Sequence, residues 1–451
     1  MSFFLTKVLA ALDDGGDRPL FIQDGVTTYH QARDRLRRLH GGLGRVETVA
    51  VDLRNRPETV LVQLAALLRG ATVVLVPASA PKADRLAAAS GATVVTDRPH
   101  DWPAGDVRTL GDLDGEPQPL NPPETVRLLF PTGGTTGTPK LIRHSGIYDG
   151  MAYIFTPSPD GPGRTLLVAP MTHMTGNATV LGTLLRQDTL VIHDGFDAEA
   201  VLDAIQDHRI DTLSLTPPRL AAVLDHPKRP ETDLTIVRSL SLGAAPLPPH
   251  RLAQALDVFG PVVGQGYGLT EAPMIASISA AELVGRPERL GSVGRIVPGM
   301  EARITEDGEV EVRGLSMMDG YLGGPEIGAG WLRTGDLGRF DDEGYLYLLD
   351  RADDVVVVGE HGTKVPTTVV EHALKTHPAV RSAAVFGRGD RLHAVVVASG
   401  EVTADELKAL ARETFGQEHY VPAAVDFADA LPLTDVGKVD KRALAQLVTA
   451  P

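Results

Sequence analysis

The chain has 451 residues, more than one ordinary hydrophobic core holds, so we expect two or three domains. Its 43 basic and 58 acidic residues give a formal net charge of −15, which argues against nucleic acid or an anionic membrane as the main partner. The sequence contains no cysteine, which excludes disulfides, thiolate metal sites and a cysteine nucleophile.

The first third of the chain alternates between helical and strand patterns. Its first residues lack a basic leader and a small-residue cleavage site, so they predict a docking helix rather than a signal peptide. The most apolar window, residues 60–78, is interrupted by Gln63, Arg69 and Gly70 and predicts a helix and a strand rather than a membrane span. We therefore expect a cytoplasmic protein with no membrane partner.

The alternation also predicts the kind of sheet. Helices are predicted at residues 29–39 and 58–68, and buried strands at 48–53, 71–76 and 92–95. Strands and helices that take turns indicate a parallel or mixed sheet covered on both faces.

The most informative segment follows a predicted strand at residues 126–130. Residues 131–140 have the sequence PTGGTTGTPK, with three glycines, four threonines and Lys140. Glycines let backbone N–H groups turn inward, while hydroxyls and an ammonium group add donors and positive charge, which suits a polyphosphate. The segment is not the common P-loop, in which Ser or Thr follows Gly-Lys. The alternative is an ordinary surface loop rich in turn formers.

The predicted secondary structure changes twice in the later part of the chain. Strands are predicted at residues 165–169, 189–193 and 212–215, a helix at 198–208, and a small β subdomain between 291 and 347. A final βα unit follows residue 350, and we place a domain boundary at residues 350–354. The patterns predict an α/β fold, in which residues 1–350 form a large N-terminal domain of mixed β-sheets layered with helices, and residues 351–451 form a small α+β C-terminal domain.

Four further short segments carry groups that suit a nucleotide. They are SLGAAP at 241–246, GQGYGLTE at 264–271, LRTGDLG at 332–338 and LPLTDVGKVDK at 431–441. Each alone is explained by an ordinary turn, and the glycines at 264–268 do not fit the dinucleotide fingerprint because their spacing is wrong. Together, in this order and over nearly the whole chain, they resemble the acyl-adenylate-forming superfamily of acyl- and aryl-CoA ligases, peptide-synthetase adenylation domains and luciferases.

The resemblance implies an enzyme that joins a carboxylic acid to ATP, releases pyrophosphate and passes the acyl group to a nucleophile, most often a pantetheine thiol. It implies ATP, Mg²⁺ and either CoA or the phosphopantetheine of an acyl carrier protein, in a monomer or homodimer whose C-terminal domain is mobile. Because the attack brings two anionic partners together, catalysis depends mainly on charge neutralisation and alignment.

Site residues are assigned by the same resemblance. The nucleotide-binding residues it implies are Thr132, Gly133, Gly134, Thr135, Thr136, Gly137, Thr138 and Lys140 at the phosphates, Gly243, Ala244, Ala245, Gly266, Tyr267 and Gly268 around the adenine, Asp336 at the ribose, and Arg351 at the ribose or a phosphate. Thr270 and Glu271 match the α-phosphate and magnesium positions, with Glu271 as the metal ligand.

Two residues of the predicted C-terminal domain match further family positions. Lys438 matches the lysine that bridges the acyl carboxylate and the α-phosphate. Lys441 is a rival three residues on, but only Lys438 follows the glycine as the pattern requires. Asp353 matches the hinge between the two domains.

The acyl-binding segment is PMTHMTG at residues 170–176. By resemblance, His173 lies at the mouth of the acyl pocket, where we favour a gating role over acid–base catalysis. Amino-acid-activating relatives carry an aspartate at the next position, and Met174 there argues against a free α-amino acid. Met174 and Met274 would form an adaptable apolar pocket suited to an aryl or medium-chain acid.

Several residues depart from the family pattern and leave the acceptor open. Pro131 opens the phosphate loop, Leu141 follows its lysine, Asp350 precedes Arg351, and Glu371 alone remains of an expected acidic pair. The leading interpretation is an acid–CoA ligase. The alternatives are a stand-alone adenylating enzyme that serves a carrier protein or another nucleophile in a biosynthetic pathway, and a non-catalytic relative that only binds nucleotide.

Overall fold

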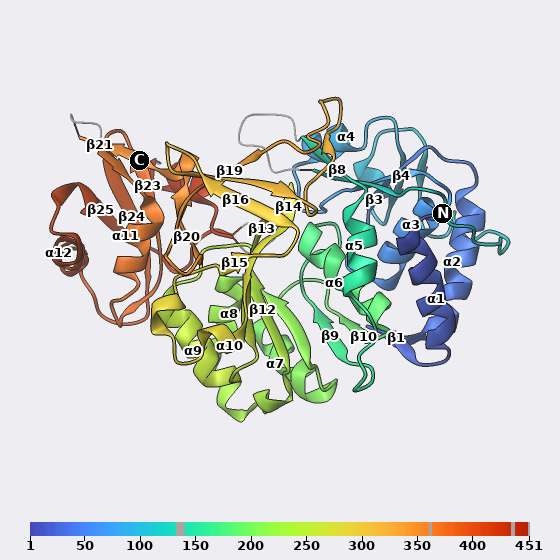
Figure 1. Cartoon of the computed structure of the whole chain (residues 1–451), viewed down its shortest axis with the longest axis horizontal. Helices are drawn as coiled ribbons and strands as arrows, with labels where there is room; N and C mark the ends of the chain where they lie inside the picture. The colour runs from blue at the N-terminus through green and yellow to red at the C-terminus, as the bar shows by residue number, and fades with distance from the viewer. Residues whose placement is uncertain (132–139, 360–362, 434–437, 450–451) are drawn as a thin grey trace.

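The computed structural model describes residues 1–131, 140–359, 363–433 and 438–449 (Figure 1). Its larger part is built on two mixed sheets. In the nine-stranded sheet the order is β15-β14-β13-β12-β11-β9-β10-β1-β2. These strands are β1 Pro19–Ile22, β2 Val26–Thr28, β9 Arg164–Leu167, β10 Thr189–Ile192, β11 Thr212–Leu215, β12 Ser239–Gly243, β13 Val263–Leu269, β14 Ala272–Ile278 and β15 Arg295–Ile296.

The seven-stranded sheet has the order β18-β8-β7-β4-β3-β5-β6. Its strands are β3 Thr48–Asp52, β4 Thr72–Leu75, β5 Thr93–Thr96, β6 Val107–Arg108, β7 Arg127–Pro131, β8 Leu141–His144 and β18 Gly320–Tyr321. Strands β3, β4, β5 and β7 run parallel, so their carboxyl ends meet at one edge. Ligands of open α/β sheets bind outside such an edge, and β7 ends there at Pro131, immediately before the threonine-rich segment in the sequence.

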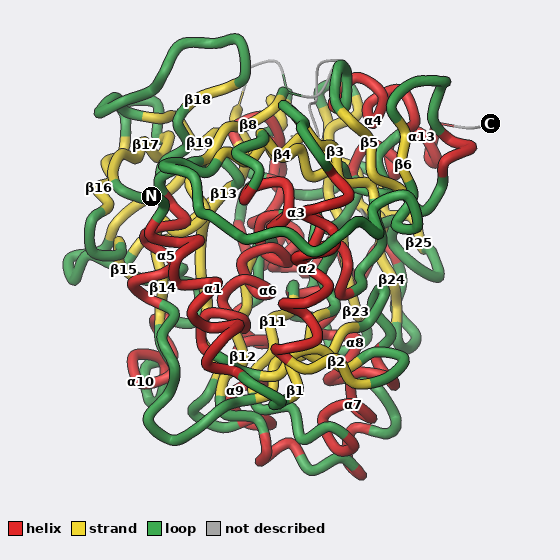
Figure 2. Tube along the Cα trace, turned by 90° about the vertical axis from the view of Figure 1, so that its right-hand side faces the viewer, coloured by secondary structure: helices red, strands yellow, loops and turns green. Residues whose placement is uncertain are grey.

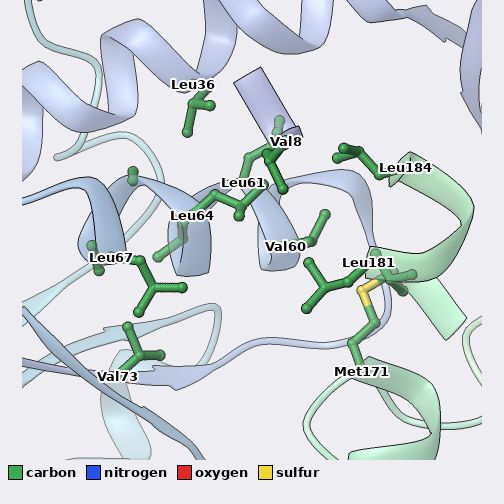
Figure 3. Packing of buried hydrophobic residues seen from close by; sticks show 14 of the residues in the cluster. Val8, Leu36, Val60, Leu61, Leu64, Leu67, Val73, Met171, Leu181 and Leu184 are labelled. Atoms are coloured by element: carbon green, nitrogen blue, oxygen red, sulfur yellow. The ribbon is translucent and has the colours of Figure 1, made fainter. Parts of the chain in front are cut away.

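Helices cover both sheets. They are α1 Phe3–Gly15, α2 Tyr29–Leu43, α3 Pro57–Leu68, α4 Lys82–Ala88, α5 Ile147–Ile154, α6 Met174–Arg186, α7 Ala198–Asp207, α8 Pro217–Leu224, α9 Pro249–Phe259 and α10 Ala280–Leu283. Helices α1, α2, α5 and α6 lie together on the face shown in Figure 2. Helix α3 is buried almost throughout, and Figure 3 shows its Leu61 and Leu64 packed among side chains of α1, α2 and α6.

Two smaller units complete the chain. A four-stranded sheet of order β16-β17-β19-β20 is antiparallel, with β16 Met300–Ile304, β17 Glu309–Gly314, β19 Leu332–Phe340 and β20 Leu346–Arg351. After the 3₁₀ turn Ala352–Asp354, the C-terminal part contains β21 Val356–Val358, β22 Thr363–Val365, α11 Thr367–Leu374, β23 Val380–Arg388, β24 Arg391–Ala398, α12 Ala404–Phe415, β25 Ala424–Phe427 and α13 Lys441–Thr449. It has its own core, which runs from Val356 to Val425.

The α/β fold is confirmed, with a large N-terminal and a smaller C-terminal domain, and α1, α2 and α3 lie where helices were predicted. None of the helices in the described residues is long and apolar enough to cross a membrane. The boundary at 350–354 stays a prediction; the 3₁₀ turn occupies it.

One local prediction was wrong. Residues 264–269 form strand β13 rather than a glycine-rich turn, because they pair with β12 and β14 on either side. Glycine is used there for close packing: a Cβ on Gly268 would lie 2.2 Å from the Pro273 carbonyl oxygen, and one on Gly243 2.7 Å from that of Gly266. The actual turn is residues 270–271.

Candidate active site

The strands on either side of the predicted phosphate-binding segment, β7 and β8, pair antiparallel. The predicted phosphate-binding residues Thr132 to Thr138 lie outside the described residues. Lys140 is described and exposed, and its Nζ lies 5.1 Å from the ring centroid of Tyr321. Sequence analysis missed Tyr321, which lies between β17 and β19 of the β subdomain in the chain but pairs with β8 in space.

Thr270 and Glu271 occupy the turn between β13 and β14, and neighbouring segments hold both. The Nε2–H of buried His144 donates to the Thr270 carbonyl at 2.6 Å, and the Tyr321 hydroxyl donates to Glu271 Oε1 at 3.1 Å. Burial lowers the pKa of His144, outweighing the opposite effect of its bond to Thr270. The neutral ring is therefore favoured as a fixed donor at this turn.

Asp336 lies on β19 beside Gly335, whose φ of +74° is one that glycine adopts without strain. Its carboxylate accepts the Tyr267 hydroxyl on Oδ2 at 2.6 Å and Arg351 Nη1 on Oδ1 at 3.0 Å. Burial, followed by the charge of Asp336, raises the pKa of Tyr267, so the hydroxyl stays a donor. A carboxylate offers about four lone-pair sites, so Asp336 retains capacity for further donors such as ribose hydroxyls.

Lys438 of the C-terminal part shares the electrostatic environment of these residues. Desolvation and then the charge of Arg351 lower its pKa, whereas Asp336 and Glu271 act in the opposite direction. The structure thus brings Lys438, Glu271, Asp336 and Arg351 together, although they are predicted to belong to two domains.

The rival, Lys441, is held elsewhere. Its Nζ donates to Thr367 Oγ1 at 2.7 Å and pairs with Glu371 Oε1 at 2.9 Å, within the C-terminal part. Glu371 is buried, and it also accepts the Val385 N–H at 2.9 Å. The surviving acidic residue of the expected pair therefore has structural partners.

The acyl-side residues are less closely grouped. His173 is the N-cap residue of α6, and Met174 begins that helix and packs against the large core. Met274 lies on β14 with 47% of its surface exposed, beside Gly266. The structure therefore places Met274 next to the predicted adenine residues, whereas Met174 lies on α6, a helix that packs against a different part of the core.

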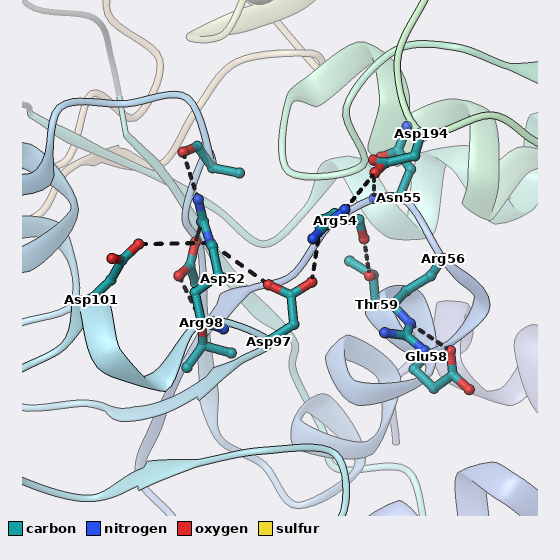
Figure 4. Close-up of polar contacts among 12 residues, drawn as sticks. Asp52, Arg54, Asn55, Arg56, Glu58, Thr59, Asp97, Arg98, Asp101 and Asp194 are labelled. Atoms are coloured by element: carbon teal, nitrogen blue, oxygen red, sulfur yellow. Dashed lines mark hydrogen bonds and ion pairs between the residues drawn. The ribbon is translucent and has the colours of Figure 1, made fainter.

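Asn55, missed by sequence analysis, fixes the loop that precedes α6 (Figure 4). Its Nδ2 donates to the carbonyls of Ala169 and His193 at 2.9 and 3.0 Å, and its Oδ1 accepts the Met171 N–H at 2.8 Å. A buried side-chain amide that uses both ends in this way fixes the backbone that leads to His173.

Asp52, also in Figure 4, is a fully buried carboxylate at the carboxyl end of β3. It accepts Arg98 Nη2 at 2.5 Å, Thr96 Oγ1 at 2.9 Å and Trp102 Nε1 at 2.9 Å. Arg85 of α4 also pairs with this carboxylate at 3.4 Å, so all its contacts are with side chains of the same sheet and its flanking segments, which makes this a structural network.

A magnesium ion fits the donor set without a dedicated cage. The described residues contain no cluster of three or more His, Asp or Glu side chains suited to a metal. Mg²⁺ typically keeps several waters and uses one or two carboxylates with substrate phosphates. Glu271 satisfies that need, because Tyr321 bonds to Oε1 and leaves Oε2 for a ligand.

Fold and site together define a two-part α/β protein with the charged groups of an adenylate-forming enzyme. Residues 10–322 match the model of the family described as AMP-binding enzyme, and residues 369–438 match the AMP-binding enzyme C-terminal domain. The chain belongs to the AMP-binding enzyme family.

Named relatives include CoA ligases. The chain is 30% identical to the 2-succinylbenzoate–CoA ligase of Bacillus licheniformis, over 98% of this chain and 97% of that protein. It is 34% identical to the medium/long-chain-fatty-acid–CoA ligase FadD8 of Mycobacterium tuberculosis, over 73% of this chain but only 63% of that protein. Among solved structures, the amide bond synthetase McbA of Marinactinospora thermotolerans superposes with a TM-score of 0.85 at 29% identity, covering 99% of this chain and 100% of that one.

Proposed function

We propose that this protein uses ATP to convert a carboxylic acid into an acyl-adenylate, releases pyrophosphate, and transfers the acyl group to the thiol of CoA. The observation that carries the proposal is the grouping of Lys438 with Glu271, Asp336 and Arg351. This grouping combines the positive charge that two anionic reactants need with one carboxylate suited to a ribose and another suited to a metal ion. A non-catalytic nucleotide-binding protein would not need the lysine of a second domain at this position.

The residues divide the first half-reaction between them. Asp336 binds the ribose hydroxyls, with Arg351 and Tyr267 fixing the carboxylate, and Tyr267 forms one face of the adenine site. Lys140 neutralises the β- and γ-phosphates, and Lys438 bridges the acyl carboxylate and the α-phosphate so that attack can occur in line. Mg²⁺ bound at Glu271 supplies charge neutralisation at the phosphate oxygens.

The acid and acceptor are proposed from the neighbours of the site. Met174 and Met274 favour an aryl or medium-chain acid over an α-amino acid, in keeping with the aryl and fatty acids named for the two curated relatives. His173 would orient the acid at the mouth of its pocket, and the mobile C-terminal domain would turn about Asp353 between half-reactions. The main alternative acceptor is an amine or a carrier protein, and the similarity to an amide bond synthetase supports keeping it.

The test is ATP–pyrophosphate exchange across a panel of aryl, medium-chain and amino acids. We expect exchange with at least one aryl or medium-chain acid and none with free α-amino acids. The active acid is then supplied with CoA, a phosphopantetheinylated carrier protein or a primary amine, and thioester or amide is measured. Exchange without thioester formation would exclude the CoA assignment, and absence of exchange with every acid would refute adenylation.

A further inference from the structure

Tyr321 contacts both of the oppositely charged side chains that we place at the phosphates and the metal. The ring lies 5.1 Å from Lys140 Nζ, and the hydroxyl donates to Glu271 Oε1 at 3.1 Å. A phenol hydroxyl is an uncharged donor, so it can donate to the Glu271 carboxylate without adding a charge of its own.

The backbone fixes this tyrosine on two sides. In the β18–β8 pair Tyr321 lies opposite Ile142, and the next N–H, that of Leu322, donates to the Leu141 carbonyl at 2.8 Å. On the other side, the Met318 N–H donates to the Glu271 carbonyl at 2.7 Å. The segment 318–322 therefore connects the strand that follows the phosphate loop to the turn that carries Glu271.

Gly320 makes this placement specific. Its φ is +148°, and a Cβ at this position would lie 2.5 Å from the Pro325 carbonyl oxygen. Only glycine tolerates both conditions. The residue before Tyr321 thus sets the direction of the side chain through the backbone.

A direct ion pair between Lys140 and Glu271 would consume the two groups that a metal–nucleotide complex needs. Within the described part of the chain, the tyrosine joins these side chains and no direct ion pair does. An aromatic face and a neutral hydroxyl are weaker partners than an opposite charge in a partly buried site. Phosphate and metal can therefore bind Lys140 and Glu271 without first breaking a salt bridge between them.

We propose that Tyr321 is a positioning residue that keeps Glu271 and Lys140 apart and directs them toward metal and polyphosphate. This role rests on the proposed function, because it assumes that a metal–ATP complex binds between these side chains. Tyr321 itself contacts neither reactant. It acts by fixing Glu271 through its hydroxyl and Lys140 through its ring.

The full-length protein can be tested without turnover, with Mn²⁺ as the metal probe and α,β-methylene-ATP as the nucleotide. In Tyr321→Phe the ring remains and the hydroxyl is lost. Electron paramagnetic resonance measures the affinity of the protein–nucleotide complex for Mn²⁺. In this variant that affinity should fall about tenfold, as expected for the loss of one hydrogen bond to a charged group. Affinity for the metal-free nucleotide should stay within about twofold, because the ring contact with Lys140 remains.

Two further variants complete the design. Tyr321→Leu removes ring and hydroxyl, so both affinities should fall. Tyr347→Phe is the matched control: its hydroxyl also donates to a carboxylate, Asp341, at 3.2 Å but lies away from the site. All variants are first checked for an unchanged unfolding transition.

The assignment is overturned if Tyr321→Phe binds Mn²⁺ as Tyr347→Phe does, or if its metal-free nucleotide affinity falls by the same factor as its Mn²⁺ affinity. The first result shows that the hydroxyl does not orient Glu271, and the second shows a general effect on the fold. If the wild-type protein exchanges pyrophosphate with no acid yet the Mn²⁺ pattern holds, the proposed reaction fails while the role of Tyr321 stands.

Discussion

Lys441→Met should loosen the C-terminal domain without touching the proposed nucleotide contacts. Lys441 Nζ lies 2.9 Å from Glu371 Oε1 and 2.7 Å from Thr367 Oγ1, and the side chain is 21% exposed. Removing one partner of a buried ion pair typically costs about 3–5 kcal/mol. Glu371 would keep Lys375, 3.7 Å from its Oε2, so we expect the lower end, about 3 kcal/mol.

Hydrogen exchange followed by mass spectrometry measures this locally, which avoids assigning one unfolding transition to a multidomain chain. A loss of about 3 kcal/mol corresponds to roughly 100-fold faster exchange in α11 and α13. Lys408→Met on α12 is the control, since that half-buried lysine donates to the Ala423 carbonyl at 2.9 Å rather than to α11 or α13. Its exchange should match wild type.

A double-mutant cycle with Glu371→Gln separates the pair from other effects. The two changes should be non-additive by about 2 kcal/mol, because each removes the same interaction. Additive effects, or unchanged exchange in α11 and α13, would show that Lys441 does not anchor the domain. Because Lys438 is three residues from Lys441, pyrophosphate exchange should also fall, and Lys441→Arg should restore it.

Four other predictions concern the domain junction and the site. Lys438→Ala should lower pyrophosphate exchange by about 10²–10³ and spare transfer from a supplied acyl-adenylate; full exchange would refute its role. Asp353→Pro should trap one conformer, so that one half-reaction is lost, and normal rates of both would place the hinge elsewhere. Asp350→Gly should speed proteolysis between the two domains by removing hydrogen bonds to α11, and an unchanged cleavage rate would contradict this. Burial, followed by the charge of Lys375, lowers the pKa of His372 from 6.5 to about 4. As pH falls, this histidine is therefore protonated in the unfolded state before it is protonated in the folded state. The free energy of unfolding should then decrease between pH 6.5 and 4, and it should decrease less in His372→Gln; urea unfolding midpoints measure both.

The fold was largely predictable because its strands are short, β-branched and separated by helices. The error at residues 264–269 arose because glycine was taken as a turn former. In the structure these glycines let three strands pack closely, and that depends on the pairing of β13 with β12 and β14, which the local composition of residues 264–269 does not reveal. The sequence favoured Lys438 over Lys441 as the catalytic lysine because only Lys438 follows a glycine. The ion pair of Lys441 with Glu371 is consistent with a structural role for Lys441 instead.

Residues that support the site were not predictable individually. Tyr321, His144 and Asn55 are ordinary residue types in ordinary local sequence, and each acts through a partner more than 45 residues away. Asp52, which belongs to a structural network rather than to the site, is different, because a carboxylate at the end of a buried strand needs a partner wherever it lies.

Asp350 shows how a departure from the family pattern can be read physically. Its carboxylate accepts the Thr367 hydroxyl at 3.0 Å and the Thr368 N–H and hydroxyl at 3.0 and 2.8 Å. It thus caps α11, which otherwise lacks a side-chain cap, from the far side of the predicted hinge. Rotation about Asp353 would break these bonds and expose the first N–H groups of α11. The common glycine could not make them, so this chain should favour the arrangement that brings Lys438 to Glu271 more strongly than relatives with glycine do. In the proposed two-step reaction, the cost of leaving that arrangement would fall on the transfer step, at which the acceptor is used.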